Sequence, residues 1–139
     1  SIMEVMGITT GTISVLVQDE RNLPIHKAIV NIYKASDENP CLISTHTTNL
    51  FGLCERIVLE APSENLSLDK NETTKPYETY TLEIIKNGYD IELRVGVQIF
   101  SNIHSTIDII LYPYIYQPNK NILVIEPHKL FNREGVVDA

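Results

Sequence analysis

Residues 76–84 read Pro76-Tyr77-Glu78-Thr79-Tyr80-Thr81-Leu82-Glu83-Ile84, and this stretch decides the fold class. Within it, apolar Tyr80, Leu82 and Ile84 alternate with polar Thr79, Thr81 and Glu83, which is the two-residue period of a strand with one buried face. Asn87-Gly88, just beyond, is typical of a tight turn. The centre of the chain is therefore predicted to be a strand followed by a turn.

The pattern continues on the far side of that turn, through Gly96-Val97-Gln98-Ile99-Phe100. Residues 91–100 place Leu93, Val95, Val97 and Ile99 on one face, and Gly96 among them predicts a bulge or a bend. Five more segments alternate or are rich in β-branched residues: 12–18, 28–32, 42–48, 55–59 and 105–111. Seven short strands with turn signals about every ten residues predict an all-β fold, an antiparallel seven-stranded β-sandwich.

The pattern divides the 139 residues into three parts. Residues 1–10 are expected to form a flexible N-terminal arm, and residues 11–113 the β-sandwich domain. Residues 114–139 are expected to be a connector with one possible extra strand, at 121–126, and an exposed tail. Residues 61–75 make the longest break between strands, and a loop of this length is typical of a functional or mobile segment.

The charge balance excludes several partner classes. The net charge of -7 and the pI of about 5.0 argue against nucleic acid and against an anionic membrane surface, because phosphate binding needs a basic surface. No run approaches ~18 apolar residues, so no transmembrane helix is expected. Residues 1–6 lack a basic region followed by an apolar one, so no secretory signal peptide is expected.

The two cysteines, Cys41 and Cys54, are expected to be free thiols. If residues 49–52 form the turn of a hairpin, Thr47 faces Cys54, and Cys41 lies roughly 20 Å farther along its strand, at ~3.3 Å per residue. A disulfide needs Cα atoms about 4.4–6.8 Å apart. We therefore interpret both as small buried apolar groups rather than as a redox pair.

Three pieces of sequence resemble the carboxypeptidase regulatory-like, or transthyretin-like, sandwich. They are Gly11-Thr12-Ile13-Ser14-Val15, the segment from Pro24 to Tyr33 that contains Ala28, and the segment from Thr47 to Gly52. A proline turn reverses the chain, a small residue at Ala28 lets two sheets close, and Gly52 supplies a permissive turn backbone.

A second resemblance covers about residues 11–127. The pieces that carry it are Ala61-Pro62, Pro76-Tyr77-Glu78-Thr79-Tyr80, Gly88-Tyr89, Gly96-Val97-Gln98-Ile99-Phe100 and Leu111-Tyr112-Pro113. They are similar to the N-terminal pre-pro region of SleC, the clostridial spore cortex-lytic enzyme family. In that family the region precedes a peptidoglycan-cleaving domain and is removed by a subtilisin-like Csp germination protease.

This resemblance implies that the chain is a pro-region and not itself an enzyme, although its parent protein would be a peptidoglycan hydrolase. It also implies a location in the cortex or coat region of the spore. The partners would be the cognate cortex hydrolase domain, in cis, and the subtilisin-like activating protease.

Neither a catalytic nor a metal-binding pattern stands out, and we expect no cofactor and no metal. The histidines His26, His46, His104 and His128 share no i,i+2 or i,i+4 spacing, and no Gly-x-Ser-x-Gly elbow carries a nucleophile. Glu78 with Glu83, or Asp90 with Glu92, could be offered as a glycosidase pair. On an antiparallel sheet we interpret such carboxylates as solubilising.

Two segments near the C-terminus are candidate interaction sites. Tyr112, Tyr114 and Tyr116 share one face of an extended segment, which could stack on sugars or pack against the sandwich. The tail residues Gly135, Val136, Val137, Asp138 and Ala139 are the candidate region for activation cleavage, because proteolysis needs an extended segment. The sequence thus predicts a non-catalytic pro-region that keeps a zymogen inactive, assists its folding, or both. The alternative is a cell-wall glycan- or protein-binding module of the adhesion type.

Overall fold

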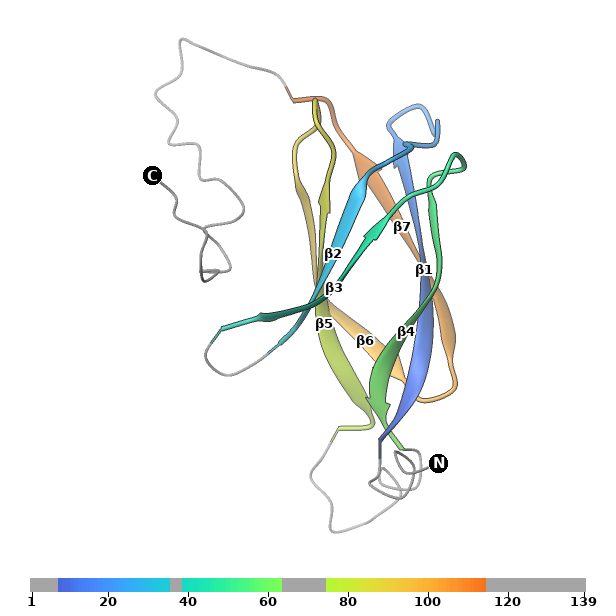
Figure 1. The fold of residues 1–139 in the computed structure, drawn as a ribbon, viewed down its shortest axis with the longest axis vertical. Helices are drawn as coiled ribbons and strands as arrows, with labels where there is room; N and C mark the ends of the chain where they lie inside the picture. Colours follow the sequence, from blue (N-terminus) through green and yellow to red (C-terminus); the bar gives the residue numbers. More distant parts are fainter. Residues whose placement is uncertain (1–7, 36–38, 64–74, 115–139) are drawn as a thin grey trace.

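The computed structural model describes residues 8–35, 39–63 and 75–114. Seven strands make up this part of the chain, and each overlaps one of the predicted segments (Figure 1). In chain order they are β1 (Ile8–Asp19), β2 (Ile29–Lys34), β3 (Cys41–Thr47), β4 (Leu53–Pro62), β5 (Tyr77–Ile85), β6 (Glu92–Phe100) and β7 (His104–Leu111).

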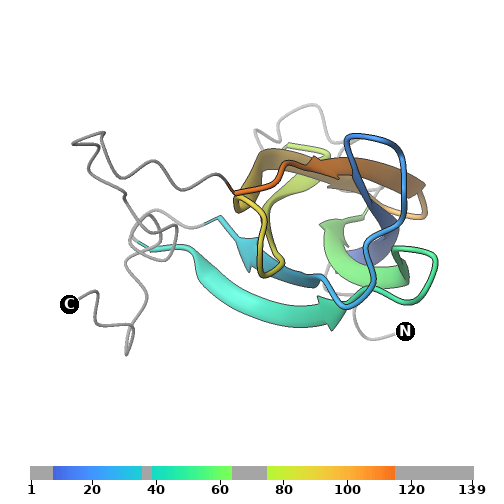
Figure 2. The same cartoon turned by 90° about the horizontal axis from the view of Figure 1, so that it is seen from above.

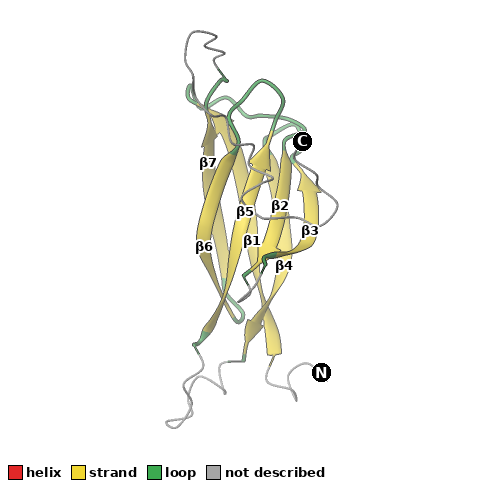
Figure 3. Cartoon of the chain, turned by 90° about the vertical axis from the view of Figure 1, so that its left-hand side faces the viewer, coloured by secondary structure: helices red, strands yellow, loops and turns green. Residues whose placement is uncertain are grey.

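The strands form two packed sheets, which confirms the predicted all-β, seven-stranded sandwich. One sheet has three strands in the order β4-β1-β7, and the other has four in the order β3-β2-β5-β6. Figure 2 looks along the strands into the space between the sheets, and Figure 3 shows β6, β5, β2 and β3 running side by side. Four of the five strand pairs are antiparallel, as expected. The pair β1 and β7 runs parallel, which the sequence did not predict.

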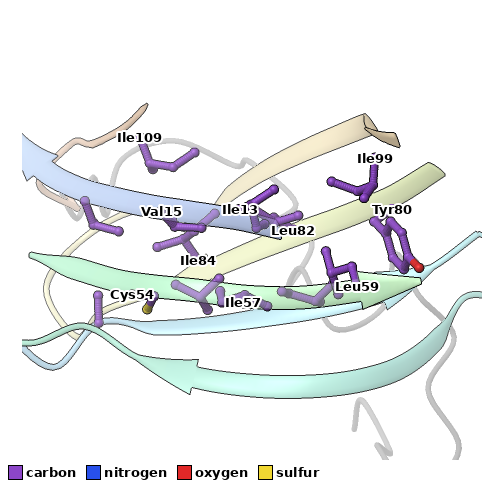
Figure 4. Packing of buried hydrophobic residues seen from close by; sticks show 14 of the residues in the cluster. Ile13, Val15, Cys54, Ile57, Leu59, Tyr80, Leu82, Ile84, Ile99 and Ile109 are labelled. Carbon is purple, nitrogen blue, oxygen red and sulfur yellow. The ribbon is translucent and has the colours of Figure 1, made fainter. Parts of the chain in front are cut away.

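The core lies between the sheets and is made of the alternating apolar residues of both (Figure 4). Ile13, Val15 and Val17 of β1 are fully buried, as are Leu82 and Ile84 of β5. The remaining buried apolar residues of this core are Ile25, Ala28, Val30, Ile32, Cys54, Ile57, Leu59, Ala61, Tyr80, Ile99, Ile109 and Leu111. Ala28 belongs to this set, in agreement with its predicted role in letting the sheets close.

A bulge at Gly96 divides β6 into two parts, as its glycine predicted. Tyr80 pairs with Val97 and Leu82 pairs with Arg94, so that one residue of β5 faces two of β6. Gly96 has a φ of 77°, a value that suits glycine. The bulge also overturns one expectation: it breaks the alternation, so that Val95 is 74% exposed and does not share the buried face of Ile99.

The connection from β3 to β4 is not a hairpin, because it passes from one sheet to the other. β3 pairs with β2, and β4 pairs with β1, so Thr47 does not face Cys54 as expected. Thr48 anchors the connection: its buried hydroxyl donates to the Ile25 carbonyl at 2.7 Å and accepts from the Ala28 amide at 2.8 Å. Gly52 completes the turn with a φ of 76°, and a Cβ there would lie 2.4 Å from the Val17 carbonyl oxygen.

The domain boundaries shift slightly from those predicted. β1 begins at Ile8 and pairs there with Pro62, so residues 8–10 belong to the sheet rather than to the predicted arm. Residues 1–7 lie outside the described residues, as do 64–74 of the long loop and the predicted extra strand at 121–126.

Candidate functional site

The β5–β6 hairpin contains three of the sequence pieces that carry the second resemblance and contacts a fourth, Leu111-Tyr112-Pro113; Ala61-Pro62 lies on β4 in the other sheet. Tyr77 and Phe100 occupy paired positions, and their ring centroids are 5.4 Å apart. At the other end of the hairpin, Tyr89 forms an isolated antiparallel bridge with Pro113. The Asp90 amide donates to the Tyr112 carbonyl at 2.9 Å, which fixes the segment after β7 against the β5–β6 turn. Pieces that are distant in sequence therefore form one structural unit.

A polar network lies on the outer face of the four-stranded sheet, the face turned away from the core. Asn31 Nδ2 and the Tyr33 hydroxyl both donate to Glu83 Oε1, each at 3.1 Å. The Thr45 hydroxyl donates to Asn31 Oδ1 at 2.8 Å. Glu83 and Tyr33 are 0% exposed, and Asn31 is 7% exposed. A buried carboxylate is tolerated when donors surround it, and here two side chains supply them.

A hollow of about 630 Å³ opens on the same outer face, beside the β5–β6 turn. Ile29 and Ile85, which pair across β2 and β5, line it together with Ile91. Tyr114, Lys27 and Lys86 also line it. The hollow is thus largely apolar with two cationic side chains at its surface.

The predicted tyrosine face is present in part. Tyr112 is 52% exposed and Tyr114 is 49% exposed. The Tyr114 amide donates to the Gly88 carbonyl at 2.8 Å, so the backbone of this segment is fixed while its rings remain accessible. Tyr116 lies outside the described residues, and so does the predicted cleavage region, Gly135, Val136, Val137, Asp138 and Ala139.

His46 on β3 and His104 on β7 lie in different sheets. His104 is exposed on β7 beside β1, with Nδ1 2.7 Å from the Thr12 hydroxyl and Nε2 3.2 Å from the Ser14 hydroxyl. His46 Nε2 lies 2.9 Å from the Ser44 hydroxyl, and partial burial lowers the pKa of His46. The contact between His104 and Ser14 pairs a base with a hydroxyl, but the other ring nitrogen meets a threonine and not a carboxylate. His128 lies outside the described residues.

The two cysteines are free, as predicted, but only one of them is buried. Cys54 lies in the core, and burial raises the pKa of its thiol to about 11. Cys41 opens β3 and is exposed, so the expectation that it packs as a buried apolar group is wrong. It lies at the edge of the four-stranded sheet, where one side of the strand has no neighbour among the described strands.

The acidic side chains weighed as a glycosidase pair do not meet. Glu78 and Glu83 are five residues apart on β5, so alternation places them on opposite faces of the sheet. Glu78 lies 3.8 Å from Lys34 at the end of the strand, whereas Glu83 belongs to the polar network. Buried Tyr80 donates its hydroxyl to the Glu60 carbonyl at 2.7 Å, and burial, with the charges of Glu78 and Glu60, raises the pKa of Tyr80.

The described residues offer neither a metal site nor a membrane-spanning helix. In residues 8–35, 39–63 and 75–114, no cluster of three or more His, Cys, Asp or Glu side chains has a geometry that could hold a metal ion. The same part of the chain contains no helix with the length and apolar character needed to cross a membrane.

These features define the chain as an all-β sandwich module, and comparison with known proteins agrees at that level. No protein-family model and no curated protein matches the sequence. Among solved structures, a mutant of catechol 1,2-dioxygenase from Acinetobacter radioresistens is similar, with a TM-score of 0.57 and 12% identity over 88% of this chain and 58% of the dioxygenase chain.

Two further similar structures have lower scores. The 3-chlorocatechol 1,2-dioxygenase of Rhodococcus opacus 1CP has a TM-score of 0.46 and 12% identity, over 76% of this chain and 61% of that one. The shaft pilin SpaA of Lactobacillus rhamnosus GG has a TM-score of 0.47 and 17% identity, over 79% of this chain and 48% of that one. The chain therefore spans less than two thirds of each, and at these identities the likeness concerns the fold alone.

The polar network is the feature that sequence reasoning missed. Alternation places Asn31 and Glu83 on the outer face, where polar residues are usually solvated, and from the sequence we accordingly interpret Glu83 as a solubilising carboxylate. Burial of that face depends on what lies over the sheet, which the two-residue period does not encode. The only sequence signal was Tyr33 on the same face as Asn31, a large ring in a position expected to be polar.

Proposed function

We propose that this chain is the non-catalytic pro-region of a spore cortex-lytic, peptidoglycan-cleaving enzyme. In this role it keeps the zymogen inactive, assists its folding, or both, until a subtilisin-like germination protease removes it. The chain would act in the spore, and the cognate hydrolase domain and the protease would be its partners.

The observation that carries the proposal is that four of the five resemblance pieces lie in the β5–β6 hairpin or contact it, while Ala61-Pro62 lies on β4. Tyr77 packs against Phe100, and Tyr89 pairs with Pro113, although these pieces are separated in the sequence. Their convergence supports the interpretation that the resemblance reflects a shared structural unit.

A pro-region of this kind can inhibit without high intrinsic affinity. Tethering to the hydrolase gives it a high effective concentration, so modest affinity suffices while the linker is intact. Cleavage removes the tether and lets the module diffuse away. An acidic module complements a basic hydrolase surface, and such an attraction weakens as salt is added.

The test is hydrolase activity on purified spore peptidoglycan, with and without this chain added in trans. We expect dose-dependent inhibition that weakens with salt. A chain carrying Leu82→Asp is the control, because Leu82 is fully buried and the charge unfolds the module. If inhibition is absent, but deletion of the region abolishes soluble hydrolase, the folding role holds. Absence of both effects overturns the proposal.

One observation favours the alternative, a binding module for cell-wall glycans or a partner protein. Tyr112 and Tyr114 lie two residues apart, and each exposes about half of its surface. Exposed aromatic rings close together are what a stacking platform requires. Sedimentation with purified cell wall tests this directly. Retention that is lost in Tyr112→Ser, but kept when exposed Val58 on the other sheet is changed to Ser, would establish binding through the tyrosines. Failure to sediment removes the alternative.

A further inference from the structure

The hollow beside the β5–β6 turn is assembled from three separate segments of the chain. Lys27 lies just before β2, and Ile29 is the first residue of that strand. The end of β5 and the turn that follows it supply most of the other lining residues, and Tyr114 comes from the segment after β7. Figure 1 places this turn and the segment after β7 at the same end of the sandwich. The volume of about 630 Å³ lies within the range of about 300–1,000 Å³ that is usual for small-molecule sites.

Backbone hydrogen bonds hold these segments in place. The Lys27 amide donates to the Thr48 carbonyl at 3.0 Å, which fixes the chain at the entry to β2. The Tyr114 amide donates to the Gly88 carbonyl at 2.8 Å, which fixes the segment after β7 against the turn. Tyr89, within that turn, packs against the hydrophobic core. A ligand that enters a hollow with a fixed backbone does not have to order it, so less conformational entropy is lost on binding.

The lining combines apolar surface with positive charge. Ile29, Ile85 and Ile91 provide the apolar surface, and Lys27 and Lys86 provide two ammonium groups. None of the described residues that line the hollow is acidic, although the whole chain has 18 acidic residues and 11 lysines and arginines. The hollow is therefore a local cationic site on an acidic protein, and it is complementary to an anion that carries an apolar group.

The two lysines are also available to a ligand. In the described part of the chain, Lys34 at the far end of β2 lies 3.8 Å from Glu78, whereas neither Lys27 nor Lys86 forms an ion pair with a described residue. Lys27 has a φ of 61°, a conformation in which glycine and asparagine are more usual than lysine. The chain thus places a cation at this position although other residues suit its backbone better.

We propose that this hollow binds a small amphipathic carboxylate, with the carboxylate at the two lysines and the apolar body against the three isoleucines. Each half of the lining then meets the half of the ligand that it complements. An ion without an apolar body, or an apolar molecule without the anion, gains only one of the two contributions. Such binding is a property of the folded module and does not depend on the proposed function.

Amide shifts in two-dimensional NMR spectra test the proposal, with octanoate as the probe. Octanoate should shift the amides of Ile29, Gly88 and Ile91 in a saturable manner and leave that of Leu59, on the other sheet, unchanged. Octylammonium and 1-octanol keep the apolar chain but lack the carboxylate. We expect each to bind roughly fivefold more weakly than octanoate, because exposed ion pairs contribute modestly. Added salt should weaken the binding of octanoate more than that of 1-octanol.

A pair of substitutions tests the role of the lysines. Lys27→Asn with Lys86→Gln removes both cations, and asparagine tolerates the positive φ at position 27. We expect octanoate to bind this variant roughly fivefold more weakly and 1-octanol to bind it as it binds the parent. Lys34→Gln with Lys75→Gln removes the same charge from residues that do not line the hollow and should bind octanoate like the parent. Urea unfolding of both variants checks that the fold is retained.

Four results overturn the proposal. The first is the absence of saturable shifts at the hollow. The second is equal affinity for octanoate and octylammonium, because the lysines then do not select the charge. The third is an equal loss of octanoate binding in both double variants, because the net charge of the protein and not the hollow then governs binding. The fourth is a shift of the same amides on raising the protein concentration without a probe, because a second copy of the chain then fills the hollow.

Discussion

Glu83 on β5 accepts a hydrogen bond of 3.1 Å from Asn31, its direct partner in register on β2. The two side chains lie on the face opposite the core, yet Glu83 has no exposed surface. If this buried carboxylate is removed, its donors, Asn31 Nδ2 and the Tyr33 hydroxyl, are each left without a buried acceptor.

Glu83→Ala should therefore destabilise the fold. Asn31 Nδ2 and the Tyr33 hydroxyl lose a buried acceptor, which costs about 2–3 kcal/mol in the free energy of unfolding. Glu83→Gln keeps one acceptor oxygen and should therefore lose less stability than Glu83→Ala. Urea unfolding followed by circular dichroism measures both. Glu55→Ala, an exposed carboxylate on β4, should stay within about 0.5 kcal/mol of the parent protein. Equal effects of Glu83→Ala and Glu55→Ala would contradict the role of the network.

Thr48→Val should destabilise the crossing between the sheets. The substitution keeps the shape of the side chain but removes the hydroxyl that bonds both the Ile25 carbonyl and the Ala28 amide. We expect a loss of about 1–3 kcal/mol, because Thr48 is buried and water does not replace the bonds. Thr47→Val, at the exposed neighbouring position, is the matched control. A Thr48→Val protein as stable as this control would show that the two hydrogen bonds make no net contribution to the free energy of unfolding.

Thiol labelling should distinguish the two cysteines. At pH 8 the exposed thiol of Cys41 should react with iodoacetamide in the folded protein, whereas Cys54 should not. Cys54 is buried, and its thiol pKa of about 11 keeps the reactive thiolate scarce. Mass spectrometry should find one label on the native chain, two in denaturant, and none on native Cys41→Ser. Native labelling of Cys54 would show that the core opens on the time scale of the reaction.

Acid should weaken the fold partly through His46. Burial lowers the pKa of His46 below its ordinary value of 6.5, so the folded state favours the neutral ring. The stability that the neutral His46 ring contributes is fully present above the pKa of His46 in the unfolded chain. This stability is lost as the pH falls through the pKa of His46 in the folded protein. Between pH 7.5 and 5, His46→Gln should lose less stability than the parent protein, as measured by urea midpoints. His26→Gln, at an exposed position, should follow the parent. Parallel losses in all three proteins would remove His46 from the acid response.

The local sequence pattern predicted where the strands lie but not which strands pair with one another. The alternation of Tyr80, Leu82 and Ile84 predicted both β5 and its buried face, and Gly96 predicted the bulge. The effect of that bulge on Val95 was not predicted, because one extra residue inverts the face of everything beyond it.

Pairing between distant segments was not predictable from local pattern. A glycine-containing turn at Gly52 looks the same whether it joins two strands of one sheet or carries the chain to the other sheet. The Thr48 bonds to Ile25 and Ala28, which fix the crossing, depend on the fold as a whole. The polar network of Asn31, Tyr33 and Glu83 was not predicted for the same reason, since its hydrogen bonds depend on the pairing of β2 with β5.

The parallel pairing of β1 and β7 has a consequence for how the chain acquires its shape. Thr12 and His104 are neighbours across that pair, although 92 positions separate them along the chain. The three-stranded sheet has β1 at its centre, so it stays incomplete during synthesis until Leu111 has left the ribosome. Sandwiches dominated by such long-range pairing reach the native state in milliseconds to seconds, slowly for their size. During translation, one edge of β1 therefore stays unpaired until β7 has been synthesised.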